Sequence, residues 1–351
     1  MEVARLHGRR DIRLHQEPAP EPAADELLLR VTAVGLCGSD RHWYEEAGIG
    51  DAHLTAPLIL GHEFAAVVEA GERQGQRVAA DPAIACGRCD VCRAGLPNLC
   101  PDLRFAGHGS TDGALRTLMT WPARLCHPLP DTISNAEGAL LEPLGVAVHA
   151  LDLGRPRRAG RVGVFGCGPI GLMLVSLLHA MEQREIVATD RLAHRASAAE
   201  AMGATDARQV GDDSQAADLG LDVAFEVAGD NAAVEHALRA VRPGGRVVLV
   251  GIPAGDRTSF RASLARRKGL TILVSRRMQP GDLPRAISLA AEGAVDLGAL
   301  VTERFPLREV RAAFDALAAW RGLKTVVEPA EEGGDKRAEA QQQHRAVKEG
   351  S

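Results

Sequence analysis

The chain has 351 residues, of which 46% are hydrophobic and 25% are charged, and its formal net charge is -5. This length is sufficient for two domains with separate cores. The weakly acidic balance gives no reason to expect nucleic-acid or anionic-membrane partners, and no apolar run is long enough to span a bilayer. The first 18 residues are charged and lack an apolar segment, so we expect no signal peptide and a cytoplasmic protein.

The N-terminal part, residues 1–143, is predicted to be mostly β. Its segments are short, and glycine and proline residues separate them. Two apolar runs, at 26–40 and 58–71, have the composition of strands.

Residues 144–274 alternate between helical and strand patterns. The expected helices are 143–154, 169–181, 192–204 and 231–241, and the expected strands are 160–166, 185–190, 221–229 and 244–251. Strands separated by helices indicate an α/β domain with a doubly wound parallel sheet covered on both faces.

The last part of the chain, 275–330, carries one or two helical patterns (283–293 and 308–319) and a short strand at 324–329. Residues 331–351 contain almost no large apolar side chains and cannot drive core burial. We therefore predict a disordered tail there.

Four of the seven cysteines lie in one loop, with the spacing C-x2-C-x2-C-x7-C: they are Cys86, Cys89, Cys92 and Cys100. In a reducing compartment, clustered cysteines favour a metal over disulfides. Four thiolates complete a tetrahedral zinc shell, which leaves no place for a substrate. The spacing therefore predicts a structural zinc site, in preference to four incidental thiols or a catalytic centre.

Other zinc-competent residues stand in two short motifs, GLCGSDRHW and GHE, which contain Cys37, Ser39, Asp40, His42, His62 and Glu63. Three protein ligands would leave a fourth position for water or substrate. Taken alone, such a cysteine beside a strand is more often a core residue. A cofactor pattern downstream favours the catalytic interpretation.

That pattern is the sequence RVGVFGCGPIG, in which an apolar strand leads through Gly166, Gly168 and Gly171 directly into a helix. Such glycines permit a tight turn and allow a pyrophosphate to approach the helix N-terminus. Asp190 ends the next strand, where a carboxylate accepts hydrogen bonds from the adenosine ribose and repels a 2'-phosphate. The pattern predicts NAD binding, although the adjacent Arg191 weakens the preference over NADP. The alternative is a doubly wound domain without a nucleotide.

Together these motifs resemble the zinc-dependent medium-chain dehydrogenases, most closely the sorbitol (L-iditol) dehydrogenase branch of polyol dehydrogenases. The resemblance extends over 2–329 and includes the motifs PLILGHE, DGAL, GALLEPLGVAVHA, LVTERFPL and GLKTVVEP. It implies a GroES-like, mostly β catalytic domain at 1–143, with a structural zinc lobe at 86–100. A Rossmann NAD-binding domain at 144–274 and a return to the catalytic domain at 275–330 complete the implied arrangement.

The resemblance implies a catalytic zinc bound by Cys37, His62 and Glu63, with Glu142 reaching it directly or through water. A carboxylate in place of a thiolate makes the ion harder, which suits a hydroxyl-rich substrate. Asp40 matches the acid that orients the imidazole of His62.

Further roles are also implied by the resemblance. Ser39 and His42 match a proton relay, with Glu142 beside them among the catalytic residues. The implied NAD contacts are Gly166, Gly168, Ile170, Gly171, Asp190, Arg195, Val250, Gly251 and Ile252. The implied substrate contacts are Trp43, Phe105, Glu142, Arg276 and Arg277.

The differences from the animal sorbitol enzymes cluster around the substrate. Trp43 and Arg277 each stand where those enzymes have a tyrosine, and His108 replaces a small polar residue. The reaction class is therefore better determined than the substrate.

The resemblance predicts an enzyme with two zinc ions per chain that transfers a hydride from a secondary hydroxyl of a polyol (sorbitol, xylitol or L-iditol type) to NAD, giving the ketose. The alternatives are a related dehydrogenase for L-idonate, galactitol, L-threonine or 2,3-butanediol, and a non-catalytic zinc-binding protein. A zinc-free quinone reductase that uses NADPH is disfavoured by the cysteine loop. The resemblance also suggests a homotetramer or homodimer, while Cys126 and Cys167 have no assigned role.

Overall fold

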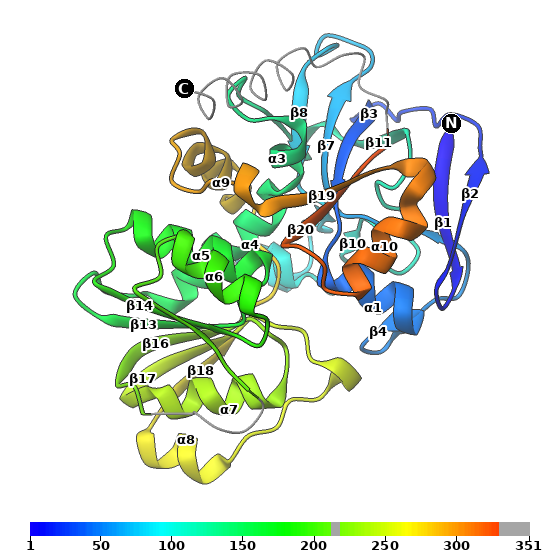
Figure 1. The fold of residues 1–351 in the computed structure, drawn as a ribbon. Coiled ribbons are helices and arrows are strands. Elements are labelled where there is room, and N and C mark those ends of the chain that lie inside the picture. Colours follow the sequence, from blue (N-terminus) through cyan, green and yellow to red (C-terminus); the bar gives the residue numbers. More distant parts are fainter. Residues whose placement is uncertain (212–217, 330–351) are drawn as a thin grey trace, which may run out of the picture.

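The computed structural model describes residues 1–211 and 218–329, which form two units (Figure 1). Residues of both units line a cleft between them. The predicted disordered tail, 331–351, lies outside the described residues. Among the described helices, none combines the length and the apolar character needed to cross a membrane.

The first unit is built on a seven-stranded sheet to which both ends of the chain contribute. In spatial order its strands are β12 (Cys126–Pro128), β8 (Arg77–Ala80), β7 (Glu63–Val68), β3 (Glu26–Gly35), β20 (Lys324–Glu328) and β19 (Val301–Pro306), with β11 (Leu118–Pro122) also paired to β3. Because β20 pairs antiparallel with β3, the C-terminal part of the chain is inserted beside the N-terminal strands.

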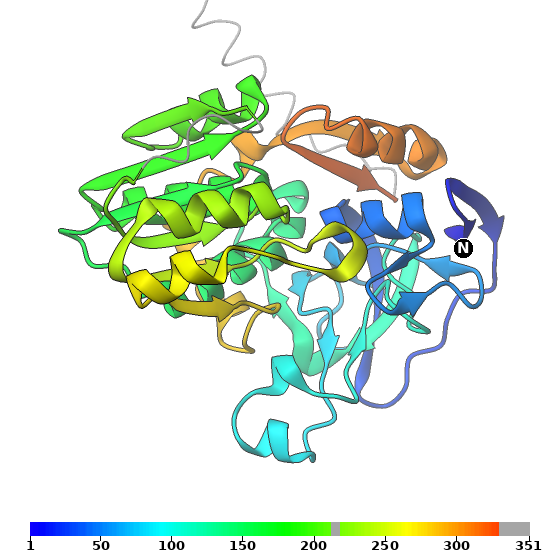
Figure 2. The same cartoon turned by 90° about the horizontal axis from the view of Figure 1, so that it is seen from below.

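Smaller elements complete this unit. Three strands form a second sheet in the order β2 (Asp11–Gln16), β1 (Glu2–Gly8) and β6 (Leu58–Ile59), and two short pairs are β4 (Gly48–Ile49) with β5 (Ala52–His53) and β9 (Ala83–Ile84) with β10 (Arg104–Phe105). The helices are α1 (Gly38–Glu46), α2 (Asp90–Arg93), α3 (Asn135–Ala139) and α10 (Val310–Ala318). The loop that carries α2 projects from the body of the molecule (Figure 2).

Helix α1 is a difference from the sequence prediction, which extended a strand to residue 40. Strand β3 ends at Gly35, and α1 begins at Gly38 with Cys37 as its N-cap. The Asp40 carboxylate accepts a hydrogen bond from the backbone N–H of Cys37 at 2.9 Å, which closes the first turn. The helix turns the polar residues of this motif towards the cleft.

The second unit confirms the predicted parallel sheet. Its strands, in spatial order, are β15 (Asp206–Gln209), β14 (Glu185–Asp190), β13 (Arg161–Phe165), β16 (Leu221–Glu226), β17 (Val241–Leu249) and β18 (Thr271–Val274). Helices α5 (Pro169–Ala180) and α6 (Ala193–Ala201) cover one face, and α7 (Asn231–Ala240) and α8 (Ala262–Lys268) cover the other (Figure 1). The sequence prediction missed β15, β18 and α8, which are short, and β19 in the first unit.

One continuous core joins the two units. Helix α4 (Leu141–Gly154) packs against α9 (Asp282–Ala291) and α5. The same buried cluster contains Ala33 and Ala65 of the first sheet as well as Val164 of the second. The junction behind the cleft is therefore close-packed, and such packing transmits strain.

Candidate active site

A cavity of about 380 Å³ lies between the two units, within the size range of small-molecule sites. Many residues predicted for catalysis and cofactor binding line it: Cys37, Ser39, His42, Glu63, Gly166, Gly168, Ile170, Asp190, Arg195, Val250, Gly251 and Ile252. The residues predicted for catalysis and those predicted for cofactor binding therefore line the same cavity.

The predicted zinc ligands meet at one end of this cavity. The donor atoms of Cys37, His62 and Glu63 lie within 4.8 Å of one another. Thiolate, imidazole and carboxylate are all zinc ligands. Glu63 is almost fully buried, and its Oε1 atom has no hydrogen-bond partner. A buried carboxylate oxygen left unpaired is costly, so this donor set fits a bound zinc ion.

Asp40 holds the imidazole of His62. Its Oδ1 atom lies 3.6 Å from Nδ1 of His62 and accepts a hydrogen bond from the N–H of Gly61. Burial favours protonated Asp40, but His62 together with the N–H groups of Cys37 and Gly61 outweighs that effect and keeps the pKa of the carboxyl below its usual value. Burial disfavours a charged His62, yet Asp40 raises the pKa of the imidazole well above its usual value. Because Nδ1 faces Asp40, Nε2 is the ring nitrogen that remains available to a zinc ion.

Glu142 lies near this group without belonging to it. It stands in the first turn of α4 and is 6% exposed. Burial raises the pKa of its carboxyl to about 8, His62 opposes that shift, and Glu63 reinforces it. A nearby dication would reverse this effect and keep Glu142 ionised. Its predicted role as a carboxylate that reaches zinc directly or through water stays a prediction.

Lys324 is a site residue that sequence reasoning missed. Its ammonium forms an ion pair with Oε2 of Glu63, and both side chains are nearly inaccessible to solvent. Lys324 also lines the cavity. The sequence analysis contained it only within the motif GLKTVVEP. It lies 261 positions after Glu63 in the sequence, so no local pattern could have paired the two residues.

Ser39 and His42 occupy neighbouring turns of α1, and both line the cavity. Residues three apart lie on one face of a helix. Ser39 Oγ lies 3.5 Å from Nε2 of His62, and Nδ1 of His42 lies 2.9 Å from a carboxylate oxygen of Glu46, which is exposed. These groups lead from the ligand end of the cavity to solvent.

The glycine-rich turn opens the cofactor end of the cavity. Gly166 has φ +103°, which favours glycine. A Cβ on Gly171 would lie 2.0 Å from the carbonyl oxygen of Gly166. Gly171 therefore serves the close approach of helix and strand, while Gly168 caps α5 beside the cavity.

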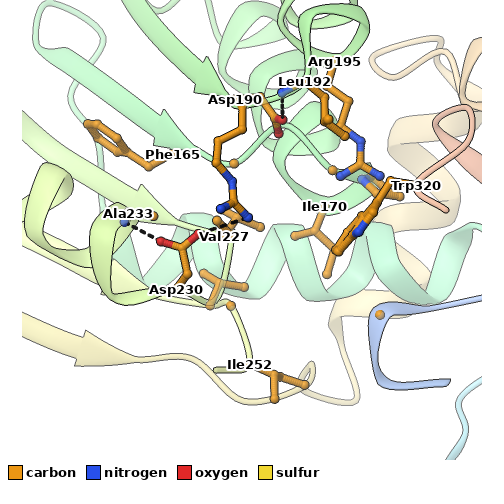
Figure 3. A pocket seen from close by; sticks show the side chains of 18 of the residues that line it. Phe165, Ile170, Asp190, Leu192, Arg195, Val227, Asp230, Ala233, Ile252 and Trp320 are labelled. Atoms are coloured by element: carbon orange, nitrogen blue, oxygen red, sulfur yellow. Dashed lines mark hydrogen bonds and ion pairs between the residues drawn. The ribbon is translucent and has the colours of Figure 1, made fainter. Parts of the chain in front are cut away.

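Asp190 stands at the end of β14, and two backbone groups hold its carboxylate. It accepts a hydrogen bond from the N–H of Cys167 at 2.7 Å. It accepts another from the N–H of Leu192 at 2.8 Å (Figure 3). Each oxygen keeps a lone pair for a ribose hydroxyl. Arg191 is directed towards Asp230, with 3.7 Å between Nη2 and Oδ2. Asp230 therefore restrains Arg191, the residue that weakened the predicted preference for NAD over NADP.

Trp320 and two arginines meet at the mouth of the same cavity. The guanidinium carbon of Arg41 lies 4.0 Å from the Trp320 ring centroid, and that of Arg195 lies 5.0 Å from it (Figure 3 shows Trp320 and Arg195). All three residues line the cavity. Arg41 and Trp320 belong to the first unit and Arg195 to the second, so this cation–π stack spans the cleft. Sequence reasoning had no signal for Arg41 or Trp320.

The four-cysteine loop forms a separate metal-binding group. Sulfur separations within it are 4.0 Å between Cys86 and Cys92 and 3.9 Å between Cys89 and Cys100. A tetrahedral site with Zn–S bonds of about 2.3 Å requires sulfur separations of ~3.8 Å. Backbone N–H groups of Arg88 and Cys89 lower the pKa of Cys86 to about 6. The loop fits a closed zinc site away from the cavity.

The predicted substrate residues do not line this cavity. The ring of Phe105 lies 5.2 Å from that of His62, between centroids. Trp43 is fully buried and meets His108 edge-on. Arg277 lies over Phe105, whereas the side chain of Arg276 is exposed. Their roles in substrate binding stay predictions.

Comparison with known proteins agrees with these features. Residues 23–131 match the family described as "Alcohol dehydrogenase GroES-like domain", and residues 169–292 match "Zinc-binding dehydrogenase". Sorbitol dehydrogenase from Bacillus subtilis is 33% identical over 94% of this chain and 97% of its own length. The sorbitol dehydrogenase of Homo sapiens is 35% identical over 92% of this chain and 94% of its own.

Among solved structures, L-idonate 5-dehydrogenase from Escherichia coli superposes with a TM-score of 0.86 at 28% identity, covering 93% of this chain and 98% of the other. The GroES-like and Rossmann fold class predicted from the sequence is confirmed, and so are zinc and NAD as cofactors. The chain therefore belongs to the zinc-dependent medium-chain dehydrogenases, in the branch that contains the sorbitol and other polyol dehydrogenases.

Proposed function

We propose that this enzyme oxidises a secondary hydroxyl of a polyol of the sorbitol, xylitol or L-iditol type with NAD, giving the ketose and NADH. The observation that carries the proposal is the shared cavity. Cys37 and Glu63 line one end of it, and Gly168 and Asp190 line the other. A hydride donor held at the first end can face a nicotinamide whose adenosine half is held at the second.

The cofactor half of the cavity supports NAD as the hydride acceptor. The N-terminus of α5 offers N–H groups to the pyrophosphate. Asp190 offers lone pairs to the ribose hydroxyls, and Val250, Gly251 and Ile252 form the opposite wall.

The chain's own groups supply the path for the hydroxyl proton. When bound at Cys37, His62 and Glu63, zinc supplies a Lewis acid that polarises the substrate hydroxyl. Ser39 Oγ accepts the proton that the hydroxyl loses, and the ring of His42 passes it towards Glu46 and solvent. Lys324 balances the negative charge of Glu63 at the same end.

A spectrophotometric screen tests this function directly. Xylitol, sorbitol, ribitol, L-idonate, L-threonine and 2,3-butanediol are each offered with NAD, and absorbance of NADH is recorded. We expect the polyhydroxylated compounds to be oxidised with kcat/KM at least about tenfold above the last two, because several hydroxyls add hydrogen bonds in the site. Fastest oxidation of L-threonine or 2,3-butanediol would assign one of the related dehydrogenase activities instead, and no turnover of any compound would support a non-catalytic protein.

The preference for NAD over NADP is a second expected result. Replacing Asp190 with alanine removes charge-assisted hydrogen bonds to the ribose and the repulsion of a 2'-phosphate, leaving Arg191 and Arg195 near that position. We expect kcat/KM with NAD to fall about 10- to 100-fold and kcat/KM with NADP to rise. The control is Asp206→Ala, because Asp206 is an acid on the neighbouring strand β15 that is not among the cavity residues. A wild type that uses NADP as efficiently as NAD would contradict the role given to Asp190.

Assembly, location and domain limits are further parts of this proposal. Strand β18 forms an edge of the parallel sheet, and Val274 on it is 77% exposed, which supports pairing with a second copy in a homodimer or homotetramer. Free thiols in the zinc loop suit the reducing cytoplasm. Sheet membership supports domain limits near 143 and 274.

A further inference from the structure

Arg277 is a cation beside the ligand end of the site that the mechanism above does not use. Its guanidinium carbon lies 4.5 Å from the ring centroid of Phe105, and Phe105 in turn lies against His62. Its Nη1 atom is buried and has no hydrogen-bond partner, and no ion pair involves Arg277 within the part of the chain that the structure describes. A guanidinium carries five donors in a planar fork that matches carboxylate and phosphate.

The segment that carries Arg277 is held firmly in a costly conformation. Arg277 has φ +57°, which is unfavourable for a residue with a Cβ. On one side, Asn98 donates a hydrogen bond to the carbonyl oxygen of Arg276 at 3.0 Å. On the other side, Gln279 donates its side-chain N–H to Asn98 at 2.9 Å and its backbone N–H to Asp282 at 2.6 Å. Backbone strain maintained by such contacts is concentrated at functional sites.

The surroundings of Arg277 are electropositive. Burial lowers the pKa of its guanidinium to about 10, and the neighbouring Arg276 adds to this shift. Burial lowers the pKa of His108 as well, followed by the charge of Arg277. Glu142 and Asp81 act in the opposite direction on Arg277, but neither forms an ion pair with it. A neutral polyol offers only hydroxyl oxygens to these groups, whereas an anionic end group would add a charge-assisted hydrogen bond to the guanidinium.

We propose that the preferred substrate is a polyol with an anionic end group, a carboxylate or a phosphate, which Arg277 binds while the hydroxyl to be oxidised lies at the Cys37, His62 and Glu63 end. This inference rests on the polyol oxidation proposed above. The two ring separations of 5.2 Å and 4.5 Å place the guanidinium carbon no more than about 9.7 Å from the centre of the His62 ring. With C–C bonds of about 1.5 Å, a chain of six carbons spans ~6 Å, so this separation is of the size that one substrate molecule with its end group covers.

The experiment compares three substrates of equal carbon number with the wild-type enzyme and NAD: an alditol, the corresponding aldonate and the corresponding alditol phosphate. We expect one of the two anions to exceed the alditol in kcat/KM by at least about tenfold, as expected for a charge-assisted hydrogen bond. The aldonate and phosphate arms distinguish the two sources of charge. Oxidation of the alditol at least as efficiently as both anions would overturn the inference and leave the proposed function intact, whereas oxidation of none would remove both.

Variants at Arg277 separate recognition of the anion from a structural role. Arg277→Met keeps an unbranched side chain but removes the guanidinium, and we expect it to raise KM for the anionic substrate about 10- to 100-fold and KM for the alditol by a smaller factor. Arg277→Lys should restore part of the lost efficiency. Arg285→Met is the matched control, because Arg285 is exposed and pairs with Asp152. Equal losses for the anion and the alditol in Arg277→Met would contradict the proposal, and the wild-type comparison decides it should that variant fail to fold.

Discussion

Replacing Cys37 with serine should lower kcat/KM for polyol oxidation by about 1,000-fold or more while leaving a folded protein that still binds NAD. The sulfur of Cys37 is one of three donors within 4.8 Å of one another, and a serine hydroxyl is a far poorer zinc ligand than a thiolate. The polarisation that zinc supplies is worth several kcal/mol, and each ~1.4 kcal/mol corresponds to a factor of ten in rate. Cys37 lies at the opposite end of the cavity from Asp190, so cofactor affinity should change little.

The matched control is Cys126→Ser. Cys126 is buried, and burial raises the pKa of its thiol to about 12, so it stays protonated and is not among the metal-binding groups of the described residues. Kinetics, NADH titration and zinc analysis are measured on both variants. We expect zinc to fall from two equivalents to one in Cys37→Ser only, in line with the two donor groups. Full activity of the Cys37→Ser variant with one equivalent of zinc would contradict the catalytic role of the site at Cys37, His62 and Glu63.

Local patterns predicted the parts of the site that depend on neighbouring residues. Within a few residues the chain passes from a strand through the turn at Gly166 into helix α5, where Gly171 lies close to the carbonyl oxygen of Gly166. Asp190 ends the following strand, and its carboxylate folds back onto the same turn. In such segments backbone geometry leaves few alternatives, so spacing alone indicates the structure.

The parts that sequence could not predict depend on contacts between distant segments. Lys324 reaches Glu63 only because β20 is inserted beside β3. Trp320 has φ +55° at the end of α10, a position that favours glycine, and only the folded chain places it between Arg41 and Arg195. The contact of Arg277, and not of Arg276, with Phe105 likewise follows from a positive φ that no propensity predicts.

Replacing Cys100 with serine should destabilise the protein, because the zinc of the four-cysteine loop contributes free energy to folding. Cys100 is buried, and its sulfur accepts a hydrogen bond from the N–H of Cys86 at 3.4 Å as well as lying 3.9 Å from that of Cys89. We expect the free energy of unfolding to fall by more than about 4 kcal/mol, as is usual when a structural metal is lost. The measurement is the apparent Tm of the purified protein, with Cys126→Ser again as the buried-cysteine control.

The same variant tests how the loop serves catalysis. Asn98 lies between the third and fourth cysteines of the loop and binds both the Arg276 carbonyl and the Gln279 side chain. Loss of the loop's zinc should therefore loosen the segment that holds Arg277, raising KM for substrate more than it lowers kcat, while the zinc held by Cys37, His62 and Glu63 is retained. If the loop were instead the catalytic centre, Cys100→Ser would abolish turnover and leave the apparent Tm unchanged. A closed shell of four thiolates has no position for substrate, so the expected outcome is a less stable enzyme that still turns over.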